Sequence, residues 1–394
     1  MKGSTSIRRV VFVHLAPPNI DSGSVVDARN ILENLANECK TICSDSVIIT
    51  NDRKLIEHLI GNRTHTEFSE ILYIPVPESP LYSRRLTVET ALAMLRNAGK
   101  SGVLFLMEEY PNVAVPILFL ASLLGSNVML KYHSYGYLFD KKYLNRVMQT
   151  LPSFKHKVLY LVISFIMTLT LRAAARICIL TPNNDLADTL NRNLGKRKAI
   201  FILPGNFMDT LPLKIRARRG GLPRYDKPRP CTVSSKIDAL TVKVANIFSK
   251  LQNVNVNIYG KLYGPQGSLI EKMLQKSNLL SYKGVLPTRN HLLELLIENC
   301  DRVFYHVGAY DTWAYSLYEL LLLFNSVYII SSSIEKVEVM AKLYKMIFDE
   351  SLCISKENHT AKFYLRKEID ERYISKLNRK YIFSICFLLK KLME

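Results

Sequence analysis

The stretch covering residues 306–330 reads HVGAYDTWAYSLYELLLLFNSVYII. It holds the end of a predicted strand (residues 302–306), a turn, a predicted apolar helix (residues 314–324) and the start of a further strand (residues 326–331). Strands that alternate with helices are typical of a parallel sheet with helices on both faces. The segment therefore predicts an α/β fold.

Two acidic residues in this stretch, Asp311 and Glu319, have seven residues between them. The turn leaves backbone N–H groups free at the start of the helix, and such an end binds phosphate groups well. Glu319, two turns into the helix, is then placed to accept hydrogen bonds from ribose hydroxyls, while Asp311 faces a sugar. A carboxylate pair at this spacing also occurs on the solvated face of any amphipathic helix. Whether this pair binds a ligand therefore has to be judged from the rest of the chain.

The same alternation of strands and helices extends through the chain. In the first half, strand-length apolar segments occur at residues 10–15, 46–50, 71–76, 103–107, 128–131, 176–180 and 199–203. In the second half they occur at residues 232–235, 254–259, 280–284, 302–306 and 326–331. Two successive series of this kind predict two Rossmann-like domains with parallel sheets that face a central cleft, where a ligand binds.

A change of composition separates the two series. Residues 211–230 carry seven basic side chains among four prolines and two adjacent glycines, which is typical of an exposed linker. A chain of 394 residues also exceeds what one hydrophobic core usually supports. We therefore expect an N-terminal domain over residues 1–210, a basic linker over residues 211–230 and a C-terminal domain over residues 231–394, whose last helix is a candidate to pack back on the first domain.

The chain is strongly basic, with a formal net charge of +19 and a pI near 9.5. Such a field attracts polyanions, which include nucleic acid, nucleotide phosphates and acidic lipid headgroups. The sequence contains no zinc-ligand spacing and no recognisable nucleic-acid-binding signature, which disfavours nucleic acid. Nucleotide phosphates and an anionic membrane surface remain as the expected partners.

The seven cysteines are scattered, odd in number and never form a CxxC pair. This pattern argues against a disulfide framework and against structural zinc, so we expect a reducing compartment. Residues 1–9 are polar and lead directly into the first predicted strand, without the apolar segment of a secretory signal. The sequence thus predicts a cytoplasmic protein.

Residues 158–171 are apolar or hydroxylic throughout, and they lie between Lys155 and Lys157 on one side and Arg172 and Arg176 on the other. A stretch of about 14 residues falls short of the roughly 20 that a helix needs to cross a bilayer. It fits a buried core helix, and it also fits a segment that lies at the inner face of a membrane with its flanking cations on acidic lipid.

The acidic pair, in this context, resembles the signature of the GT-B glycosyltransferases, in particular the retaining family 4 group with its two glutamates separated by seven residues. Asp311 stands in place of the first glutamate, and Glu319 corresponds to the second. Thr312 and Ala314 replace glycines of the family, and Phe324 stands where a glycine usually precedes the next strand.

Other segments resemble the same family in the same order, over about residues 10–349. LKYHSYGY (residues 130–137) places His133 directly after a strand, as in the family. AIFILPGNFMD (residues 199–209) resembles a scrambled version of its Pro-Asn-Gly-Val-Asp turn. VNVNIYGKLYG (residues 254–264) is similar to its strand and glycine turn, and YKGVLPTRNHLLELL (residues 282–296) to its base-facing loop.

The resemblance implies transfer of a sugar from a nucleotide sugar to a hydroxyl of a lipid-linked or polymeric glycan acceptor, with retention of configuration and without a metal or other cofactor. The N-terminal domain would bind the acceptor and the C-terminal domain the nucleotide sugar. Asp311 would orient the donor sugar, and His133 would contact the sugar or the diphosphate. Glu108 and Glu109, after another strand, are candidate acceptor-side groups.

The resemblance also implies which residues hold the donor. Gly23 would let phosphates or the acceptor approach the backbone, and Glu319 would hold the ribose. A pair of cations and the start of a helix would offset the negative charge that develops on the leaving diphosphate. The donor-binding residues implied in this way are Gly23, Lys236, Lys243, Gly260, Thr312, Trp313 and Glu319.

Two alternatives compete with sugar transfer. A GT-B sugar-nucleotide epimerase shares the architecture but needs a cleft rich in acids and histidines, and the eight histidines here form no such cluster along the sequence. The other alternative is a degenerate GT-B protein that binds a nucleotide sugar, an anionic lipid or nucleic acid without turnover, which the lost glycines favour.

Overall fold

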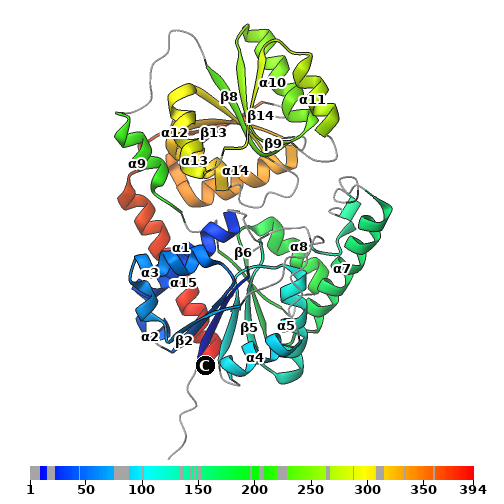
Figure 1. Cartoon of the computed structure of the whole chain (residues 1–394), viewed down its shortest axis with the longest axis vertical. Helices are drawn as coiled ribbons and strands as arrows, with labels where there is room; N and C mark the ends of the chain where they lie inside the picture. Colours follow the sequence, from blue (N-terminus) through cyan, green and yellow to red (C-terminus); the bar gives the residue numbers. More distant parts are fainter. Residues whose placement is uncertain are drawn as a thin grey trace, which may run out of the picture. The chain divides into compact units, whose positions relative to one another are not determined.

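The computed structural model divides into two compact units, Met1–Met208 with Lys376–Glu394 (unit 1) and Asp209–Ser375 (unit 2) (Figure 1). The structure describes residues 9–15, 23–43, 45–74, 88–99, 102–133, 137–141, 144–145, 148, 153–195, 198–203, 208–220, 229–262, 267–286, 288–307, 315–331, 334–357 and 360–394. Each unit contains one sheet with helices packed around it, so the predicted pair of Rossmann-like domains is confirmed.

Unit 1 contains a seven-stranded parallel sheet in the order β3-β2-β1-β4-β5-β6-β7. This is the doubly wound order, in which the strand order reverses between β1 and β4. The strands are β1 (Val10–His14), β2 (Ser46–Thr50), β3 (Glu70–Tyr73), β4 (Val103–Leu106), β5 (Asn127–Lys131), β6 (Ile177–Thr181) and β7 (Ala199–Ile202).

The central strands of unit 1 are buried on both faces, which explains why they are continuous apolar runs rather than alternating ones. Along β1, Val11 and Val13 join one hydrophobic cluster, while Val10 and Phe12 join the other. The first cluster lies under α4 (Val88–Ala98), α5 (Pro111–Leu124), α7 (Phe154–Ala173) and α8 (Asn184–Leu194). The second lies under α1 (Gly23–Glu38), α2 (Lys40–Cys43), α3 (Arg53–Gly61) and α15 (Glu371–Met393).

The last helix, α15, belongs from Lys376 onward to unit 1, although it is the final element of the chain. Ile382, Ile385 and Leu389 are fully buried in the cluster with β1 and α1, and each contributes about 2 kcal/mol by burial. Asn378 donates to the Met208 carbonyl at 2.6 Å and accepts from the Met208 N–H at 2.8 Å. The two ends of unit 1 are thus held together by packing and by backbone recognition.

Unit 2 contains a seven-stranded sheet in the order β10-β9-β8-β11-β12-β14-β13. The first five strands are parallel, and β14 pairs antiparallel with both β12 and β13. The strands are β8 (Pro230–Ile237), β9 (Val256–Leu262), β10 (Leu280–Gly284), β11 (Arg302–His306), β12 (Ser326–Ile330), β13 (Leu352–Glu357) and β14 (Thr360–Leu365). The helices are α9 (Leu211–Arg218), α10 (Ala239–Gln252), α11 (Gly267–Gln275), α12 (Arg289–Asn299), α13 (Tyr315–Phe324) and α14 (Ile334–Phe348).

Residues 211–230 were expected to form an exposed linker. The structure differs there, because the first half of this stretch forms helix α9 of unit 2. Pro212 lies in the first turn of this helix, where a proline costs no backbone hydrogen bond. Pro212 and Ile215 are buried, and Arg216 donates to the Asn325 side chain at 2.5 Å. Two buried apolar side chains and a side-chain hydrogen bond therefore outweigh the basic composition, while residues 221–228 lie outside the described part.

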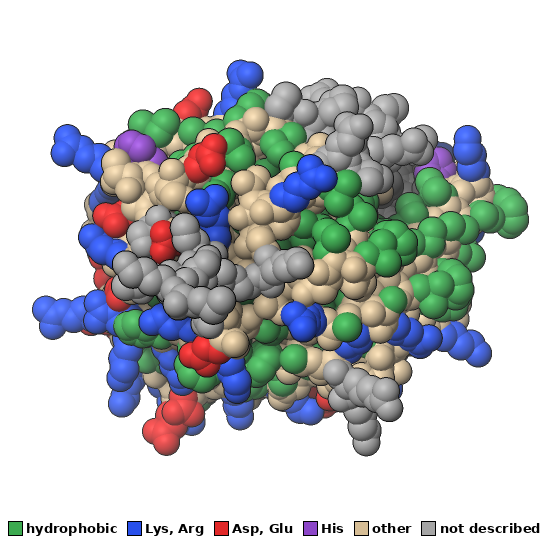
Figure 2. Space-filling view, turned by 90° about the horizontal axis from the view of Figure 1, so that it is seen from below, with side chains coloured by type: hydrophobic (Ala, Val, Ile, Leu, Met, Phe, Trp, Pro, Cys, Tyr) green, Lys and Arg blue, Asp and Glu red, His purple; other side chains and the backbone are tan. Residues whose placement is uncertain are grey.

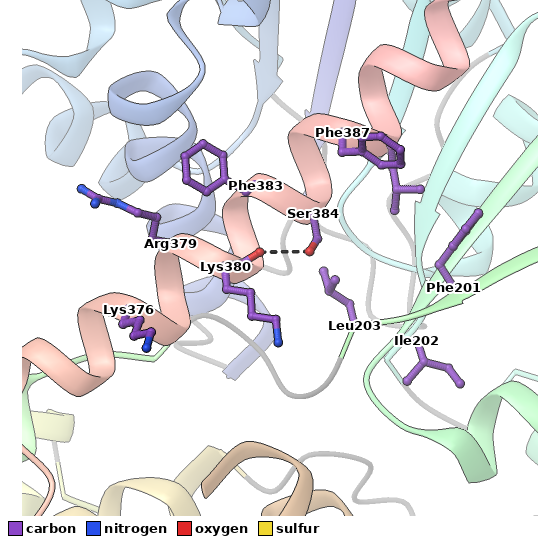
Figure 3. A pocket seen from close by; sticks show the side chains of 10 residues that line it. Phe201, Ile202, Leu203, Lys376, Arg379, Lys380, Phe383, Ser384 and Phe387 are labelled. Carbon is purple, nitrogen blue, oxygen red and sulfur yellow. Dashed lines mark hydrogen bonds between the residues drawn. The ribbon is translucent and has the colours of Figure 1, made fainter. Parts of the chain in front are cut away.

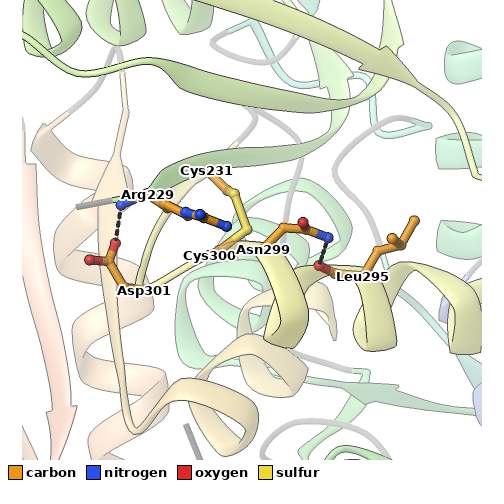
Figure 4. The surroundings of a disulfide bond; sticks show 6 residues. All are labelled: Arg229, Cys231, Leu295, Asn299, Cys300 and Asp301. Atoms are coloured by element: carbon orange, nitrogen blue, oxygen red, sulfur yellow. Dashed lines mark hydrogen bonds between the residues drawn. A yellow bond between two sulfur atoms is a disulfide. The ribbon is translucent and has the colours of Figure 1, made fainter. Parts of the chain in front are cut away.

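The prediction that the cysteines form no disulfide framework is wrong, because the structure contains Cys39–Cys386 in unit 1 and Cys231–Cys300 in unit 2. Cys231 is the second residue of β8 and Cys300 lies two residues before β11, and these two strands are parallel neighbours (Figure 4). Their Cα atoms lie 5.8 Å apart, and Asp301 accepts a hydrogen bond from the Arg229 N–H beside them. Parallel neighbouring strands start at the same edge of the sheet. The strand order therefore brings together two cysteines whose spacing in the sequence gives no sign that they pair.

Replacing Cys231 and Cys300 together by alanine should lower the free energy of unfolding of unit 2 by about 4 kcal/mol, because the bond closes a loop of 69 residues in the unfolded chain. Urea unfolding with and without reductant measures this loss. Reductant should not lower the free energy of unfolding of unit 2 any further in the double variant. Alkylation of both cysteines in unreduced, denatured protein would show that the bond does not form.

Gly260 in β9 sits against the backbone of β8. Its φ is +139°, and a Cβ atom there would lie 2.0 Å from the Ser234 carbonyl oxygen and 3.3 Å from Ile237 Cγ1. The pairing of β8 with β9 shifts register between Val233 and Lys236, next to this contact. The structure thus gives Gly260 a local reason to be glycine, besides the donor-binding role expected from the sequence.

Gly260→Ala should destabilise unit 2 by about 3 kcal/mol, since it combines a backbone clash with an unfavourable φ. Gly267→Ala, at the start of α11, is the matched control, because no atom lies within 4 Å of the added Cβ. Urea unfolding of the two variants should show a loss only for Gly260→Ala. Equal stabilities would contradict the strained contact.

Candidate functional site

The carboxyl edge of the unit 1 sheet gathers charged side chains. His14 ends β1, Lys131 ends β5, and Asp52, Glu108 and Glu109 lie in the residues that follow β2 and β4. Parallel strands all end at one edge of their sheet, which is where ligands bind in doubly wound folds. The fold therefore brings together residues that are far apart in the sequence.

His14 has no exposed surface and lies between two carboxylates. Its Nδ1 is 2.5 Å from Glu108 Oε1, and its Nε2 is 3.5 Å from Asp52 Oδ2. Burial alone lowers the pKa of His14, but the charges and hydrogen bonds of Glu108 and Asp52 outweigh it and raise the pKa to about 9. The imidazole is therefore a buried cation at neutral pH, unsuited to act as a general base.

Asp52 is shared between His14 and Arg29 of α1. Arg29 donates to Asp52 Oδ2 through Nε at 2.9 Å and through Nη2 at 2.7 Å. Burial opposes ionisation of Asp52, yet the hydrogen bonds from His14 and Arg29 hold its pKa well below the usual range. The other carboxylate oxygen of Asp52 accepts from the Lys54 N–H and caps α3.

A second buried ion pair joins Lys131, at the end of β5, to Asp27 of α1. Both side chains are almost fully buried, and the Lys131 ammonium also lies 5.4 Å from the centre of the Tyr381 ring of α15. A buried ion pair adds little net stability, but removing one partner is costly. The pair therefore fixes the start of α1, which begins at Gly23, relative to the centre of the sheet.

His133, predicted as a strand-end site residue, lies two residues after β5 at this edge. Its backbone N–H donates to Glu109 Oε2 at 3.1 Å, and its Nε2 lies 3.3 Å from the Met107 carbonyl oxygen. Burial lowers the pKa of His133 well below 6.5, so the ring is neutral at physiological pH. The two candidate acids thus make different contacts in the structure. Glu108 pairs with the His14 ring, and Glu109 accepts a hydrogen bond from the His133 backbone.

In unit 2, Glu319 lies on α13 and is 5% exposed. Arg289, the first residue of α12, donates from Nε to Glu319 Oε1 and from Nη1 to Asp209 Oδ2, the latter at 2.9 Å. The Tyr318 hydroxyl donates to the Asp209 carbonyl at 2.8 Å. One guanidinium therefore joins three segments of the unit through two carboxylates.

Burial raises the pKa of Glu319 to about 7, although Arg289 acts in the opposite direction. A carboxyl group with a pKa near neutrality can hold a proton or release it in the physiological range. Sequence reasoning found Glu319 but missed Arg289, because the two residues are 30 positions apart and only the packing of α12 against α13 joins them.

Asp311, Thr312 and Trp313 lie outside the described residues, and so does the turn that was expected to hold the phosphates. The described part of α13 begins at Tyr315. The roles assigned to these three residues therefore stay predictions.

His306, which sequence reasoning did not single out, ends β11 at the carboxyl edge of the unit 2 sheet. It is 4% exposed, and neither ring nitrogen has a hydrogen-bond partner among the described residues. Its Nε2 lies 3.5 Å from Asp238 Oδ2, while Asp238 Oδ1 accepts from the Thr241 N–H and caps α10. The signal that could have found His306 is its position at a strand end.

The predicted cations of unit 2 do not form a described pair. Lys236 lies in β8, but its side chain is outside the described part, and Lys243 is exposed on α10. The Asp238 carboxylate caps the N-terminus of α10 by accepting from the Thr241 N–H, so this helix end already carries a negative charge. Within the described residues, no group of three or more His, Cys, Asp or Glu side chains is arranged to hold a metal ion.

A groove of about 700 Å³ lies in unit 1 between β7 and α15. Phe201, Phe383 and Phe387 line its apolar part, and Lys376 and Lys380 lie along the same helix (Figure 3). The lining contains no carboxylate and no histidine. We therefore assign the groove no part in the chemistry.

Comparison of the sequence with protein families and with curated proteins finds no match. The structure is similar to a lipopolysaccharide outer core galactosyltransferase, with a TM-score of 0.50, 11% identity and coverage of 96% of this chain and 99% of that one. It is also similar to a sucrose-phosphate synthase from Thermosynechococcus elongatus, with a TM-score of 0.53, 14% identity and coverage of 98% of both chains. At such low identity the likeness establishes the fold, which is that of the GT-B glycosyltransferases.

His14→Gln should destabilise unit 1 by about 3 kcal/mol below pH 6.5, because it removes a cation whose pKa rises from 6.5 to about 9 on folding. A raised folded-state pKa contributes stability that is complete below the unfolded pKa and is lost as the pH rises through about 9. Urea unfolding from pH 6 to pH 10 should show the difference between wild type and variant shrinking in that window. His291→Gln, at an exposed site on α12, controls for the substitution itself, and a constant difference across the range would contradict the buried imidazolium.

Proposed function

We propose that the chain is a glycosyltransferase that moves a sugar from a nucleotide-sugar donor to a hydroxyl of a lipid-linked or polymeric glycan acceptor. The observation that carries the proposal is the buried carboxyl group of Glu319, eight positions after Asp311 and oriented by Arg289 in a GT-B fold. The similar structures support it, because one is named a galactosyltransferase and the other a sucrose-phosphate synthase.

Unit 2 would hold the donor. Arg289 engages one oxygen of Glu319, and the second oxygen is the one proposed to accept hydrogen bonds from the ribose hydroxyls. Arg289 and Asp209 are then positioning residues, since they fix the rotamer of Glu319 without touching the donor. Asp311 would orient the sugar at the bond that breaks.

The diphosphate would lie against the start of the helix that contains Thr312 and Trp313. Breaking the glycosyl–phosphate bond leaves negative charge on the diphosphate, and a helix N-terminus with nearby cations offsets it without a metal ion. The capping of α10 by Asp238 supports this choice of helix, because a carboxylate at that end opposes the binding of a second anion. Lys236 is the proposed first cation and Lys243 the second, with Gly260 and Gly23 allowing close backbone approach.

Unit 1 would bind the acceptor. The neutral ring of His133 supports a role as a hydrogen-bonding contact for the sugar or the diphosphate rather than as a charged one. We further propose retention of configuration, which follows from the resemblance of the acidic pair to the retaining family 4 enzymes.

We also propose that the protein works at an anionic membrane on the cytoplasmic side. The net charge of +19 supports an acidic lipid surface, and the cytoplasmic leaflet carries such a surface. The two disulfides count against a reducing compartment, so this location rests on charge alone.

A GT-B protein that binds a nucleotide sugar, an anionic lipid or nucleic acid without turnover is the alternative. The residues that replace glycine in the acidic motif, Thr312 and Ala314, favour it, because each adds a side chain where the family keeps the backbone open. Turnover therefore has to be measured apart from binding.

Asp311→Asn and Glu319→Gln should each slow hydrolysis of the accepted nucleotide sugar by about a hundredfold, since each removes a carboxylate from the donor site. The donor is found first by thermal shift over a panel of nucleotide sugars, because a ligand of the folded form raises its Tm. Glu271→Gln, an exposed acid on α11 of the same unit, is the matched control and should keep the wild-type rate.

Equal background rates in wild type and in both site variants, together with a Tm shift by a nucleotide sugar, would establish the alternative of binding without turnover. A panel in which no nucleotide sugar shifts the Tm of the wild-type protein would overturn both functions.

A further inference from the structure

Two neighbouring helices of unit 1 expose a continuous set of large apolar side chains. In Figure 2, hydrophobic side chains gather on the right, the side on which α7 lies in Figure 1, with Lys and Arg side chains around them. We define the α5–α7 face by its exposed apolar residues: Phe119, Leu123 and Leu124 on α5, and Phe154, Val158, Leu159, Val162, Phe165, Ile166 and Leu169 on α7.

The exposure on this face is high for apolar side chains. Phe154 is 81% exposed, Leu123 68% and Phe119 57%. Single exposed apolar residues are ordinary, but a contiguous group of this size on a folded protein marks a surface that binds something. The face therefore needs an occupant.

The opposite side of α7 is packed against protein. Ser164, Met167 and Leu171 are fully buried, and Met167 and Leu171 belong to the hydrophobic cluster under α5 and α8. By length and apolar composition α7 could cross a membrane, and it is the one described helix of which this holds. Because its inner side is part of the core, α7 is suited to lie on a bilayer rather than to cross it.

The charged side chains on the two helices of the face have one sign. Neither α5 nor α7 contains an Asp or Glu residue, whereas α7 contains Lys155, Lys157 and Arg172, and Arg176 follows it. Arg172 donates to the Asn193 carbonyl at 2.6 Å and Arg176 to the Gly125 carbonyl at 3.1 Å, so these bonds leave both positive charges unneutralised.

An apolar face with a rim of unneutralised cations complements an acidic bilayer, in which acyl chains take up the apolar side chains and headgroups meet the cations. A second copy of the chain is a poorer match, because a symmetric contact would bring the cations of the two copies together and neither helix supplies an acid to pair with them. We propose that the α5–α7 face docks unit 1 on an anionic membrane, with α7 lying in the headgroup layer.

This proposal deepens the membrane-side function proposed above. It rests on that function for the reason why the protein would dock on a membrane, but the docking itself is tested independently. Its test uses no nucleotide sugar and no turnover. Failure of docking and failure of sugar transfer are therefore distinguishable.

The full-length protein is mixed with vesicles of neutral lipid alone or of neutral lipid with an acidic phospholipid, and bound protein is measured by flotation. The wild type should float with the acidic vesicles, and binding should fall as salt is raised from about 0.05 M to 0.5 M, because salt screens the cations. A variant with Phe119→Ser, Leu123→Ser and Phe154→Ser should bind at least about tenfold more weakly, since three side chains no longer enter the acyl layer.

The matched control replaces three exposed apolar residues of unit 2, Ile247→Ser, Leu251→Ser and Leu269→Ser, and should bind like the wild type. Equal unfolding midpoints of both variants would exclude misfolding as the cause of a loss. Lys155→Glu with Lys157→Glu should weaken binding to acidic vesicles by a similar factor.

Three results would overturn the proposal. One is wild-type binding that does not depend on acidic lipid. Another is equal binding by the α5–α7 face variant and the unit 2 control. The third is a dimer in size-exclusion chromatography that the face variant abolishes, without any vesicle binding by the wild type, which would assign the face to a second copy.

Discussion

Both units depend on one constraint, namely that a buried charge has to be paired. In unit 1, His14 is completely buried and is held between Glu108 and Asp52, and Asp52 is held in turn by Arg29. An isolated buried charge costs several kcal/mol, so these groups stay inside only as a set. Because the set draws on β1, on the segments after β2 and β4, and on α1, it fixes the edge where a ligand of this fold binds.

The same constraint acts in unit 2 through a single guanidinium. Arg289 is paired with Glu319 and Asp209, and these residues come from α12, α13 and the segment before α9. Such an arrangement holds Glu319 in one orientation before any ligand arrives, which reduces the ordering cost of binding. Helix α9 itself belongs to a packed part of unit 2 through Pro212 and Ile215, and Asp209, just before it, supports the acid proposed to hold the ribose through Arg289.

Unit 1 uses the two faces of its sheet differently. One face is covered by α1, α2, α3 and the end of the chain in α15, and Cys39–Cys386 joins the residue between α1 and α2 to α15. The other is covered by α4, α5, α7 and α8, and two of these helices have apolar outer sides. A basic protein with one apolar face can combine electrostatic attraction with burial at a bilayer, whereas either term alone gives weak binding.

The sequence by itself determined the alternation of strands and helices, the two Rossmann-like domains and the position of His133 at a strand end, because apolar runs of strand length and helical spacing are local properties. The contacts that make these elements a site are not local. His14 and Glu108 are 94 positions apart, and Cys231 and Cys300 are 69 apart, so only the order of strands in each sheet brings them together. Residues 158–171 are apolar or hydroxylic on every side, so periodicity could not tell which side of α7 is buried. The tertiary structure decided which side that is, because only one side of a helix can face a sheet and Met167 packs against the core.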